Sequence, residues 1–232
     1  MRSRRSRSKN WDEHVDDLEE MASSGAFQAL RDHILELARL RANDHLLDVG
    51  AGTGLLALAA APHVARVSAL DVSPAMCNHL QAKLDRARVS NMEVLVNTAT
   101  DIPLADDTVD VVLSNYCFHH LTDVEKRRAL IEIGRVLRPG GRLVFADMMF
   151  RVTVTSRRDR AVIALLVKRM LRRGPAGLVR LCRNAVRVLT RSWEHPASVD
   201  WWREALLAAG FAEVTVRALE HEGGIAFARR PG

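Results

Sequence analysis

The sequence predicts an α/β fold, a Rossmann-like three-layer sandwich whose seven-stranded sheet is mostly parallel with an antiparallel last strand. Two observations carry this prediction. From residue 45 onward, short apolar runs typical of buried strands alternate with stretches of helical periodicity. A glycine-rich turn, residues 50–54, follows the first of these runs and precedes a stretch without helix breakers. This alternation places helices on both faces of a parallel sheet.

Local signals define the individual elements. Two helices are expected in residues 11–41, broken near Ser23-Ser24-Gly25. Ser73 is placed to cap a later helix, with Pro74 at its first position. A helix at about 124–137 ends at the Pro139-Gly140-Gly141 turn. Strands are predicted at 45–49, 65–70, 92–96, 108–114, 142–148, 212–218 and 225–228, and further helices at 55–61, 160–173, 178–191 and 199–209.

The chain of 232 residues fits one domain with appendages. We expect a disordered basic tail at 1–10 and a single domain at 11–232, with N-terminal helices at 11–41 and a basic helical insertion at about 151–193, called the basic insertion below. No apolar stretch approaches the roughly 18 residues of a membrane span, and no secretory signal follows the charged N-terminus. Three widely spaced cysteines indicate neither disulfides nor a metal site. We therefore expect a cytoplasmic protein.

The net charge of +6 is distributed unevenly along the chain. Residues 1–10 contain five basic groups and no acid, and the basic insertion contains twelve basic groups against one acid. Subtraction leaves a net charge of −10 for the rest of the chain. This asymmetry indicates an anionic partner, either a nucleic acid or a lipid surface.

The turn in DHLLDVGAGTGLLALAA contains Gly50, Gly52 and Gly54 between a strand and a helix. Glycines there let the backbone approach a ligand, and the helix N-terminus offers free N–H groups to an anion. From Gly52 onward the turn also fits the dinucleotide pattern G-x-G-x-x-A. Asp71, at the end of the second strand, is placed to bind the ribose hydroxyls of any such cofactor.

Asp48 helps to distinguish the two kinds of cofactor. It lies two residues before Gly50, where a carboxylate would repel a pyrophosphate. A carboxylate at this position suits a ligand whose nearby group is a cation. S-adenosylmethionine has an ammonium, a sulfonium and no phosphate. The sequence therefore favours S-adenosylmethionine, with a nicotinamide dinucleotide as the alternative.

Four stretches in a fixed order resemble a known family. They are LLDVGAGTGLLALAA, VSALDVSPAM, DIPLADDTVDVVLSNYCFHHL and EIGRVLRPGGRLVFADMM. Together they are similar to the class I S-adenosylmethionine-dependent methyltransferases, in particular to the small-molecule branch that includes quinone and sterol methylases. The resemblance covers about residues 44–150. It implies S-adenosylmethionine as cofactor, S-adenosylhomocysteine as product, and methyl transfer to a small acceptor.

The resemblance also implies roles for individual residues. The glycine turn would pass under the methionine part of the cofactor, and Asp48 would orient this turn and face the cationic end. Asp71 would accept hydrogen bonds from both ribose hydroxyls. Val72 and Met76 would flank the adenine, and Ser114 or Asn115 would contact the methionine group. The full set of implied cofactor-binding residues is Asp48, Gly50, Ala51, Gly52, Gly54, Asp71, Val72, Met76, Thr98, Ala99, Ser114 and Asn115.

One position departs from the family pattern. Members often have Asp-Ala where this chain has Thr98-Ala99, and that aspartate holds the adenine amino group. The Thr98 hydroxyl accepts a hydrogen bond more weakly than a carboxylate, and Asp101 is a candidate substitute. Methyltransferases that act on base amino groups have Asn-Pro-Pro-Tyr after the fourth strand. This chain lacks both prolines there, which counts against that chemistry.

His119 and His120 are the candidate catalytic residues. Methyl transfer by direct displacement depends on alignment of the reacting groups, and it needs a base only if the nucleophile loses a proton. Both histidines follow the fourth strand, at the edge where such sheets hold ligands, and some similar O-methyltransferases use a histidine near here as base. For each histidine, a packed or capping role is the alternative. Asp147 either contacts the substrate or ends its strand, and Cys117 reads as a packed thiol.

The basic insertion is expected to cover the active site. Four arginines of its second helix form one stripe opposite apolar residues: Arg180, Arg183, Arg187 and Arg191. We hypothesise that this stripe lies on anionic lipid at the inner face of a membrane and delivers a lipophilic acceptor. RNA methylation, suggested by the Ser/Arg tail, is the alternative, although the insertion has Trp193 as its one aromatic residue for stacking. A solvated lid and a non-catalytic cofactor-binding subunit are the remaining alternatives.

Overall fold

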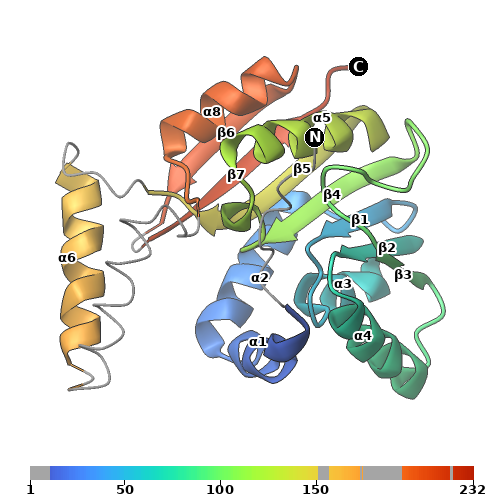
Figure 1. Cartoon of the computed structure of the whole chain (residues 1–232). Coiled ribbons are helices and arrows are strands. Elements are labelled where there is room, and N and C mark those ends of the chain that lie inside the picture. The colour runs from blue at the N-terminus through green and yellow to red at the C-terminus, as the bar shows by residue number, and fades with distance from the viewer. Residues whose placement is uncertain (1–10, 151–156, 173, 175–194, 220–221) are drawn as a thin grey trace, which may run out of the picture.

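The computed structural model describes residues 11–150, 157–172, 174, 195–219 and 222–232. Figure 1 shows a central sheet between two layers of helices. The strand order is β3-β2-β1-β4-β5-β7-β6. Neighbouring strands pair in parallel except at β7, which is antiparallel to both β5 and β6. The predicted fold class is confirmed.

The central strands are buried on both faces, which explains their continuous apolar runs. Successive side chains of a strand point to opposite faces, so Leu46 packs in one core and Leu47 in the other. The strands of the described chain are β1 (His45–Val49), β2 (Arg66–Asp71), β3 (Met92–Val96), β4 (Val109–Asn115), β5 (Leu137–Met148), β6 (Ala212–Ala218) and β7 (Gly223–Arg229).

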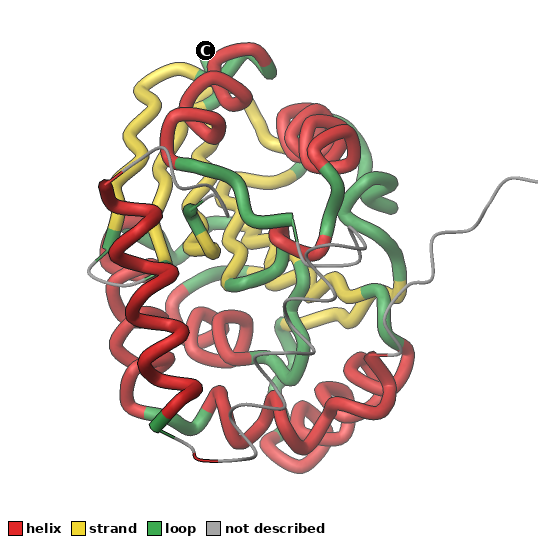
Figure 2. The backbone as a smooth tube through the Cα atoms, turned by 60° about the vertical axis from the view of Figure 1, so that its left-hand side comes forward, coloured by secondary structure: helices red, strands yellow, loops and turns green. Residues whose placement is uncertain are grey.

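Two helical layers supply the other halves of these cores. One layer consists of α2 (Gly25–Ala38), α3 (Leu55–Ala60) and α4 (Pro74–Ala87), and the other of α5 (Asp123–Val136) and α8 (Val199–Ala208). The remaining described elements are η1 (Trp11–His14), α1 (Val15–Ala22), η2 (Ala61–His63), η3 (Phe118–His120) and α6 (Arg157–Leu171). Figure 2 shows α6 running along one side of the molecule.

Hydroxyl side chains cap the helices that position the site. The Ser73 hydroxyl accepts a hydrogen bond from the Met76 N–H at 3.2 Å, and Pro74 is the first residue of α4, as predicted. Thr122 and Glu125 form a reciprocal capping box at the start of α5. These caps place the N-termini of both helices beside the carboxyl ends of β2 and β4.

Several predicted elements have different boundaries in the structure, mostly by one or two residues. Strand β5 begins at Leu137 rather than at residue 142, because Leu137 already pairs with Val109 before a register shift. The predicted turn is therefore a bulge inside the strand, where Gly140 has a φ of 76°. Helix α3 ends at Ala60 and continues as a short 3-10 turn, and α6 begins at Arg157 rather than 160. The tail at 1–10 and the predicted helix at 178–191 lie outside the described residues. Within the described residues, no helix has the length and apolarity needed to cross a membrane.

A buried ion pair joins β5 to the loop between α2 and β1. The Arg142 guanidinium donates to the Asp44 carboxylate at 2.5 Å and to the carbonyl groups of Ala38 and Arg39. Asp44 also accepts the Arg41 N–H at 2.8 Å. Both charged side chains are nearly inaccessible to water, so neither can lose its partner without a large desolvation cost.

We expect Arg142→Leu to lower the free energy of unfolding by about 3 kcal/mol, because Asp44 would keep a buried charge without its partner. Urea denaturation followed by circular dichroism measures this change. The control, Asp32→Asn, removes an exposed ion pair with Arg31 and should change the free energy by less than about 0.5 kcal/mol. Equal small effects of both variants would contradict the role assigned to Arg142.

Candidate functional site

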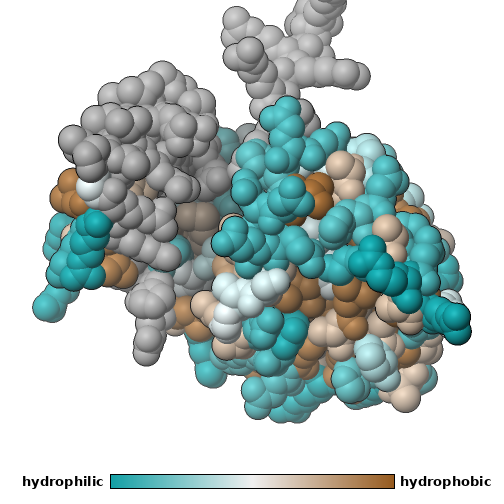
Figure 3. Space-filling view, turned by 90° about the horizontal axis from the view of Figure 1, so that it is seen from below, coloured by the Kyte–Doolittle hydropathy of each residue, from teal (hydrophilic) through white to brown (hydrophobic). Residues whose placement is uncertain are grey.

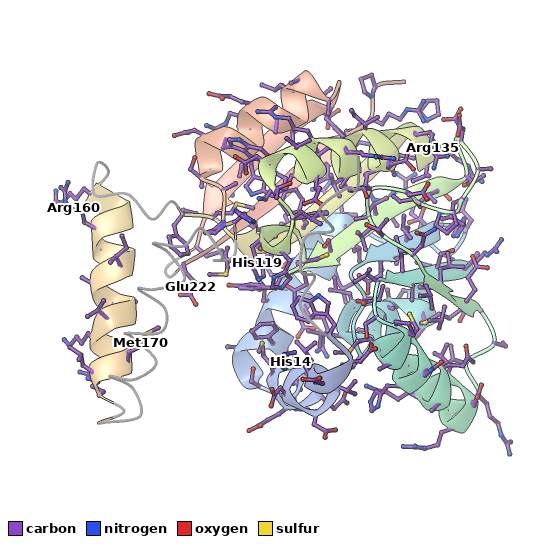
Figure 4. The ribbon with its side chains drawn as sticks, in the orientation of Figure 1. His14, His119, Arg135, Arg160, Met170 and Glu222 are labelled. Carbon is purple, nitrogen blue, oxygen red and sulfur yellow. The ribbon has the colours of Figure 1, made fainter. Side chains whose placement is uncertain are left out.

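Most of the predicted site residues gather at one edge of the sheet, where the carboxyl ends of β1, β2, β4 and β5 meet. The glycine turn follows β1, Asp71 ends β2, Asn115 ends β4, and Asp147 lies near the end of β5. Figure 4 labels His119, which follows β4 at the same edge. This is the place where open α/β sheets hold their ligands.

The glycine turn is fastened to the end of β2. The N–H groups of Gly50 and Ala51 both donate to the Leu70 carbonyl, at 2.8 and 2.9 Å. The three glycines of the turn have φ angles of 73°, 52° and 92°, a region that favours glycine. A Cβ on Gly50 would overlap the Cys117 side chain, whereas a Cβ on Gly52 would meet nothing within 4 Å. The turn therefore packs on Cys117, just after β4, at one glycine and leaves room for a ligand at the next.

Asp71 links the glycine turn to α4. One carboxylate oxygen accepts the Gly52 N–H at 2.8 Å, and the other accepts the Ser73 N–H at 2.9 Å. Burial raises the pKa of Asp71, and these backbone donors oppose that rise. Each carboxylate oxygen has a second lone pair, so Asp71 can still accept hydrogen bonds from a ligand.

Asp48 is a second buried carboxylate at this edge. Its side chain accepts the Ala57 N–H at 3.0 Å, which fixes the first turn of α3 behind the glycine turn. Burial, with a further contribution from the negative charge of Asp71, raises the pKa of Asp48 to about 7. Asp48 thus contacts the first turn of α3 directly, and its predicted role toward a cofactor stays a prediction.

Beyond Asp71, the residues predicted to surround the adenine have different environments. Val72 is 56% exposed, which leaves its side chain available to a flat ring, whereas Met76 and Ala99 are buried. The Thr98 hydroxyl lies 3.2 Å from that of Thr100. These positions are compatible with an adenine site, with Val72 as its exposed apolar wall.

Two polar side chains at the end of β4 differ in their hydrogen bonding. The Ser114 hydroxyl is buried and donates to the Val49 carbonyl at 2.8 Å, so it ties β4 to β1. The buried Asn115 Oδ1 has no hydrogen-bond partner within the described residues. A buried acceptor without a donor costs free energy, which a ligand N–H at this position would offset.

His119 and Asp147 form a buried pair. The His119 Nδ1 lies 2.6 Å from the Asp147 carboxylate, whose other oxygen accepts the His119 backbone N–H at 2.9 Å. The same carboxylate accepts the Met148 N–H. Asp147, for which the sequence left two roles open, therefore orients the histidine directly from the neighbouring strand.

Aromatic rings surround this pair. The Tyr116 ring lies between Phe27, at 5.3 Å, and His119, at 5.9 Å between ring centroids. His120 contacts the Trp11 ring edge-to-face at 4.4 Å. Flat aromatic side chains, both apolar and polar, thus gather at the carboxyl edge beyond the glycine turn.

The N-terminal segment contributes contacts that sequence reasoning missed. Asp12 accepts hydrogen bonds from the Ser73 hydroxyl at 2.5 Å and the Ala75 N–H at 3.2 Å, while its neighbour Trp11 packs on His120. Element η1 therefore reaches from the start of α4 to η3. In the sequence, the one sign of these contacts is a tryptophan and an aspartate directly after the basic tail. Their partners lie more than 60 residues away, so the sequence alone does not identify them.

A buried lysine joins η3 to the chain that returns from the basic insertion. Lys126 Nζ donates to the carbonyl groups of Leu121, at 2.7 Å, and His195, at 2.5 Å. The His195 N–H in turn donates to the His119 carbonyl at 2.7 Å. Burial lowers the pKa of Lys126, and these carbonyl groups compensate the desolvated ammonium. The chain just after the insertion is thereby attached to His119.

Cys117 is packed rather than reactive. Its side chain lies against Gly50. Burial and the negative charges of Asp71 and Asp147 raise the pKa of the thiol well above its ordinary value. A thiol that stays protonated is a poor nucleophile, which agrees with the packed role predicted for it.

These features fit a cationic cofactor. Two buried carboxylates beside the glycine turn would repel a pyrophosphate, and the unpartnered Asn115 Oδ1 can accept a hydrogen bond from a donor such as an ammonium. Among the described residues, no cluster of histidine, cysteine and carboxylate side chains suits a metal ion. The donor and acceptor set therefore matches the amino-acid part and ribose of S-adenosylmethionine.

Comparison with known proteins identifies the family. The methyltransferase domain family matches residues 47–145. A demethylmenaquinone methyltransferase of Clavibacter sepedonicus is 33% identical over 186 residues, which cover 77% of this chain and 69% of that protein. This chain belongs to the class I S-adenosylmethionine-dependent methyltransferases. S-adenosylmethionine, rather than a dinucleotide, is the cofactor of this methyltransferase family.

Other relatives share parts of the chain or its fold. The methyltransferase YcgJ of Bacillus subtilis is 33% identical over 114 residues, which cover 49% of this chain and 44% of that protein. The chain thus spans about half the length of such curated relatives. A methyltransferase in complex with the Haloferax volcanii Trm112 methyltransferase activator has a TM-score of 0.68 at 21% identity, covering 98% of this chain and 100% of that one. At this identity the likeness concerns the fold.

The raised pKa of Asp48 predicts a pH dependence of stability. The folded-state pKa of about 7 exceeds the ordinary value of 3.8, so the folded chain holds a proton that the unfolded chain releases. The contribution of Asp48 is complete below about pH 4 and is lost as pH rises to 7. Asp48→Asn has no such proton to release, so we expect its stability relative to the parent to increase between pH 4 and pH 8, by on the order of 4 kcal/mol.

Urea denaturation of both proteins at several pH values measures this difference. Asp32→Asn, at an exposed carboxylate, is the control and should show a difference that hardly changes with pH. A constant difference for Asp48→Asn as well would mean that Asp48 is charged throughout this range.

Proposed function

We propose that this methyltransferase transfers a methyl group from S-adenosylmethionine to a small, lipophilic acceptor. The observation that carries the proposal is the set of rings around the buried His119–Asp147 pair, beside the glycine turn. Aromatic walls bind flat apolar molecules. The relative from Clavibacter, a demethylmenaquinone methyltransferase, is named for a quinone substrate, which supports an acceptor of this class.

The cofactor is proposed to lie along the carboxyl ends of β1, β2 and β4. When bound, S-adenosylmethionine supplies an electrophilic methyl group on a sulfonium. Asn115 Oδ1 would accept from its ammonium, and the Asp71 carboxylate from its ribose hydroxyls. Asp48 lies behind the glycine turn, and a cationic cofactor beside it would favour its ionised form. The adenine would lie against Val72 and near Thr98, with Met76 and Ala99 behind it.

His119 is the better candidate for a base. Because an ionised carboxylate can only accept a hydrogen bond, Asp147 places the ring proton on Nδ1 and leaves the Nε2 lone pair available. A base held in this tautomer removes a proton from an acceptor hydroxyl or amine as the methyl group is transferred. His120 packs on Trp11 and would serve as a wall of the acceptor site.

Methyl transfer to separated cell fractions tests the acceptor class. The full chain is incubated with methyl-labelled S-adenosylmethionine and with lipid extract, RNA or protein in separate reactions. We expect label in a small organic-soluble product. Label in RNA instead would favour the RNA alternative, and absence of label in all fractions, with intact cofactor binding, would indicate a non-catalytic subunit.

We expect Gly50→Ala to weaken S-adenosylhomocysteine binding at least about tenfold, because the new Cβ would push Cys117 and the glycine turn apart. Isothermal titration calorimetry measures the dissociation constant. Gly140→Ala is the matched control, since Gly140 has a φ of 76° but nothing within 4 Å of an added Cβ. It should lose stability while binding normally. Similar affinities of the two variants would argue against a cofactor site at this turn.

We expect His119→Ala to lower turnover of the labelled acceptor by roughly 100-fold or more and to leave S-adenosylhomocysteine affinity almost unchanged. Asp147→Asn should lower turnover as well, since an amide can present the wrong partner to Nδ1. His120→Ala should act mainly on the acceptor KM. A large loss of turnover in His120→Ala with none in His119→Ala would transfer the role of base to His120.

A further inference from the structure

Helix α6 presents an exposed face that is both basic and apolar. With 3.6 residues per turn, its exposed positions fall within an arc of about 140°. We call this surface, which includes the residue directly after the helix, the α6 face. Its members among the described side chains are Arg157, Arg160, Ala161, Ala164, Leu165, Lys168, Leu171 and Arg172.

The composition of the α6 face differs from that of an ordinary solvated helix. Four of its eight residues are cations and none is acidic. Between these cations, Leu165 is 44% exposed and Leu171 is 52% exposed. Single exposed leucines are common, but leucines and cations combined on one arc are typical of helices that lie in a membrane interface. Figure 3 shows hydrophobic and hydrophilic surface intermixed at the side where α6 lies.

The side chains of the α6 face are exposed in the described part of the chain. Among the described elements, none packs along the helix. In Figure 4 the Arg160 side chain points away from the sheet, while Met170 lies on the side toward it. The strand β4 points toward the side of the molecule where α6 stands (Figure 1). A surface that contacts the α6 face would therefore lie on the same side as the carboxyl edge of the sheet.

We propose that the α6 face docks this protein on a bilayer that contains anionic phospholipids. The cations are attracted to lipid headgroups, and Leu165 and Leu171 enter the boundary between headgroups and acyl chains. RNA fits this face less well, since α6 has no aromatic residue to stack on bases and the leucines would have no partner. Docking of this kind is possible whatever the methyl acceptor is.

Vesicle co-sedimentation of the full chain tests the proposal. We expect sedimentation with vesicles of phosphatidylcholine and phosphatidylglycerol, and little with phosphatidylcholine alone. The double variant Lys168→Glu/Arg172→Glu should lower the partition coefficient at least about tenfold. Leu165→Ser/Leu171→Ser should also weaken binding, because the inserted apolar area is lost.

The double variant Arg86→Glu/Arg128→Glu is the matched control. It makes the same change in net charge at two exposed cations, one on α4 and one on α5, and should bind vesicles almost as the parent does. Equal losses in both charge-reversed variants would assign binding to overall charge and overturn the proposal. No binding to vesicles, or equal binding to neutral and anionic vesicles, would also overturn the proposal. So would normal vesicle binding of the Leu165→Ser/Leu171→Ser variant together with displacement of the protein from vesicles by RNA. Thermal melting and S-adenosylhomocysteine titration show that each variant is folded, independently of any methyl transfer.

Discussion

The carboxylate of Asp71 holds together the edge on which the rest of the site depends. Its two oxygens accept the N–H groups of Gly52, in the turn after β1, and Ser73, at the start of α4. The glycine turn is also fastened to β2 through the Leu70 carbonyl. Asp71 therefore fixes the turn after β1 and the start of α4 relative to each other at the point where a cofactor would lie. The backbone donors offset part of the cost of burying the Asp71 charge.

A second buried carboxylate makes this edge electrostatically demanding. Asp48 has one backbone donor and lies close enough to Asp71 for the two charges to interact, which contributes to its raised pKa. Such a pair is unfavourable in the absence of a cation. The two buried carboxylates lower the stability of the protein without ligand, a cost that is typical of binding sites. The same two groups favour a sulfonium cofactor over a pyrophosphate at this turn.

Local patterns predicted most elements because each depends on neighbouring residues. Ser73 and Pro74 begin α4 as expected, and each strand has its own apolar run. The start of β5 was predicted five residues late, since Pro139-Gly140-Gly141 has the composition of a turn. In the structure Leu137 pairs with Val109, and the Arg230 N–H donates to the Gly141 carbonyl at 2.8 Å. These partners from distant parts of the chain extend the strand through a bulge.

Residue order and spacing were sufficient for the fold class, the glycine turn and the choice of a cationic cofactor, because these follow from contacts along the chain or between consecutive strands. Three-dimensional packing decided the acceptor half of the site. It paired His119 with Asp147 across adjacent strands, brought Trp11 against His120, and attached His195 to His119 beside the buried Lys126. The spacing of apolar residues along the sequence does not predict such contacts, because they depend on which strand ends become neighbours when the sheet forms.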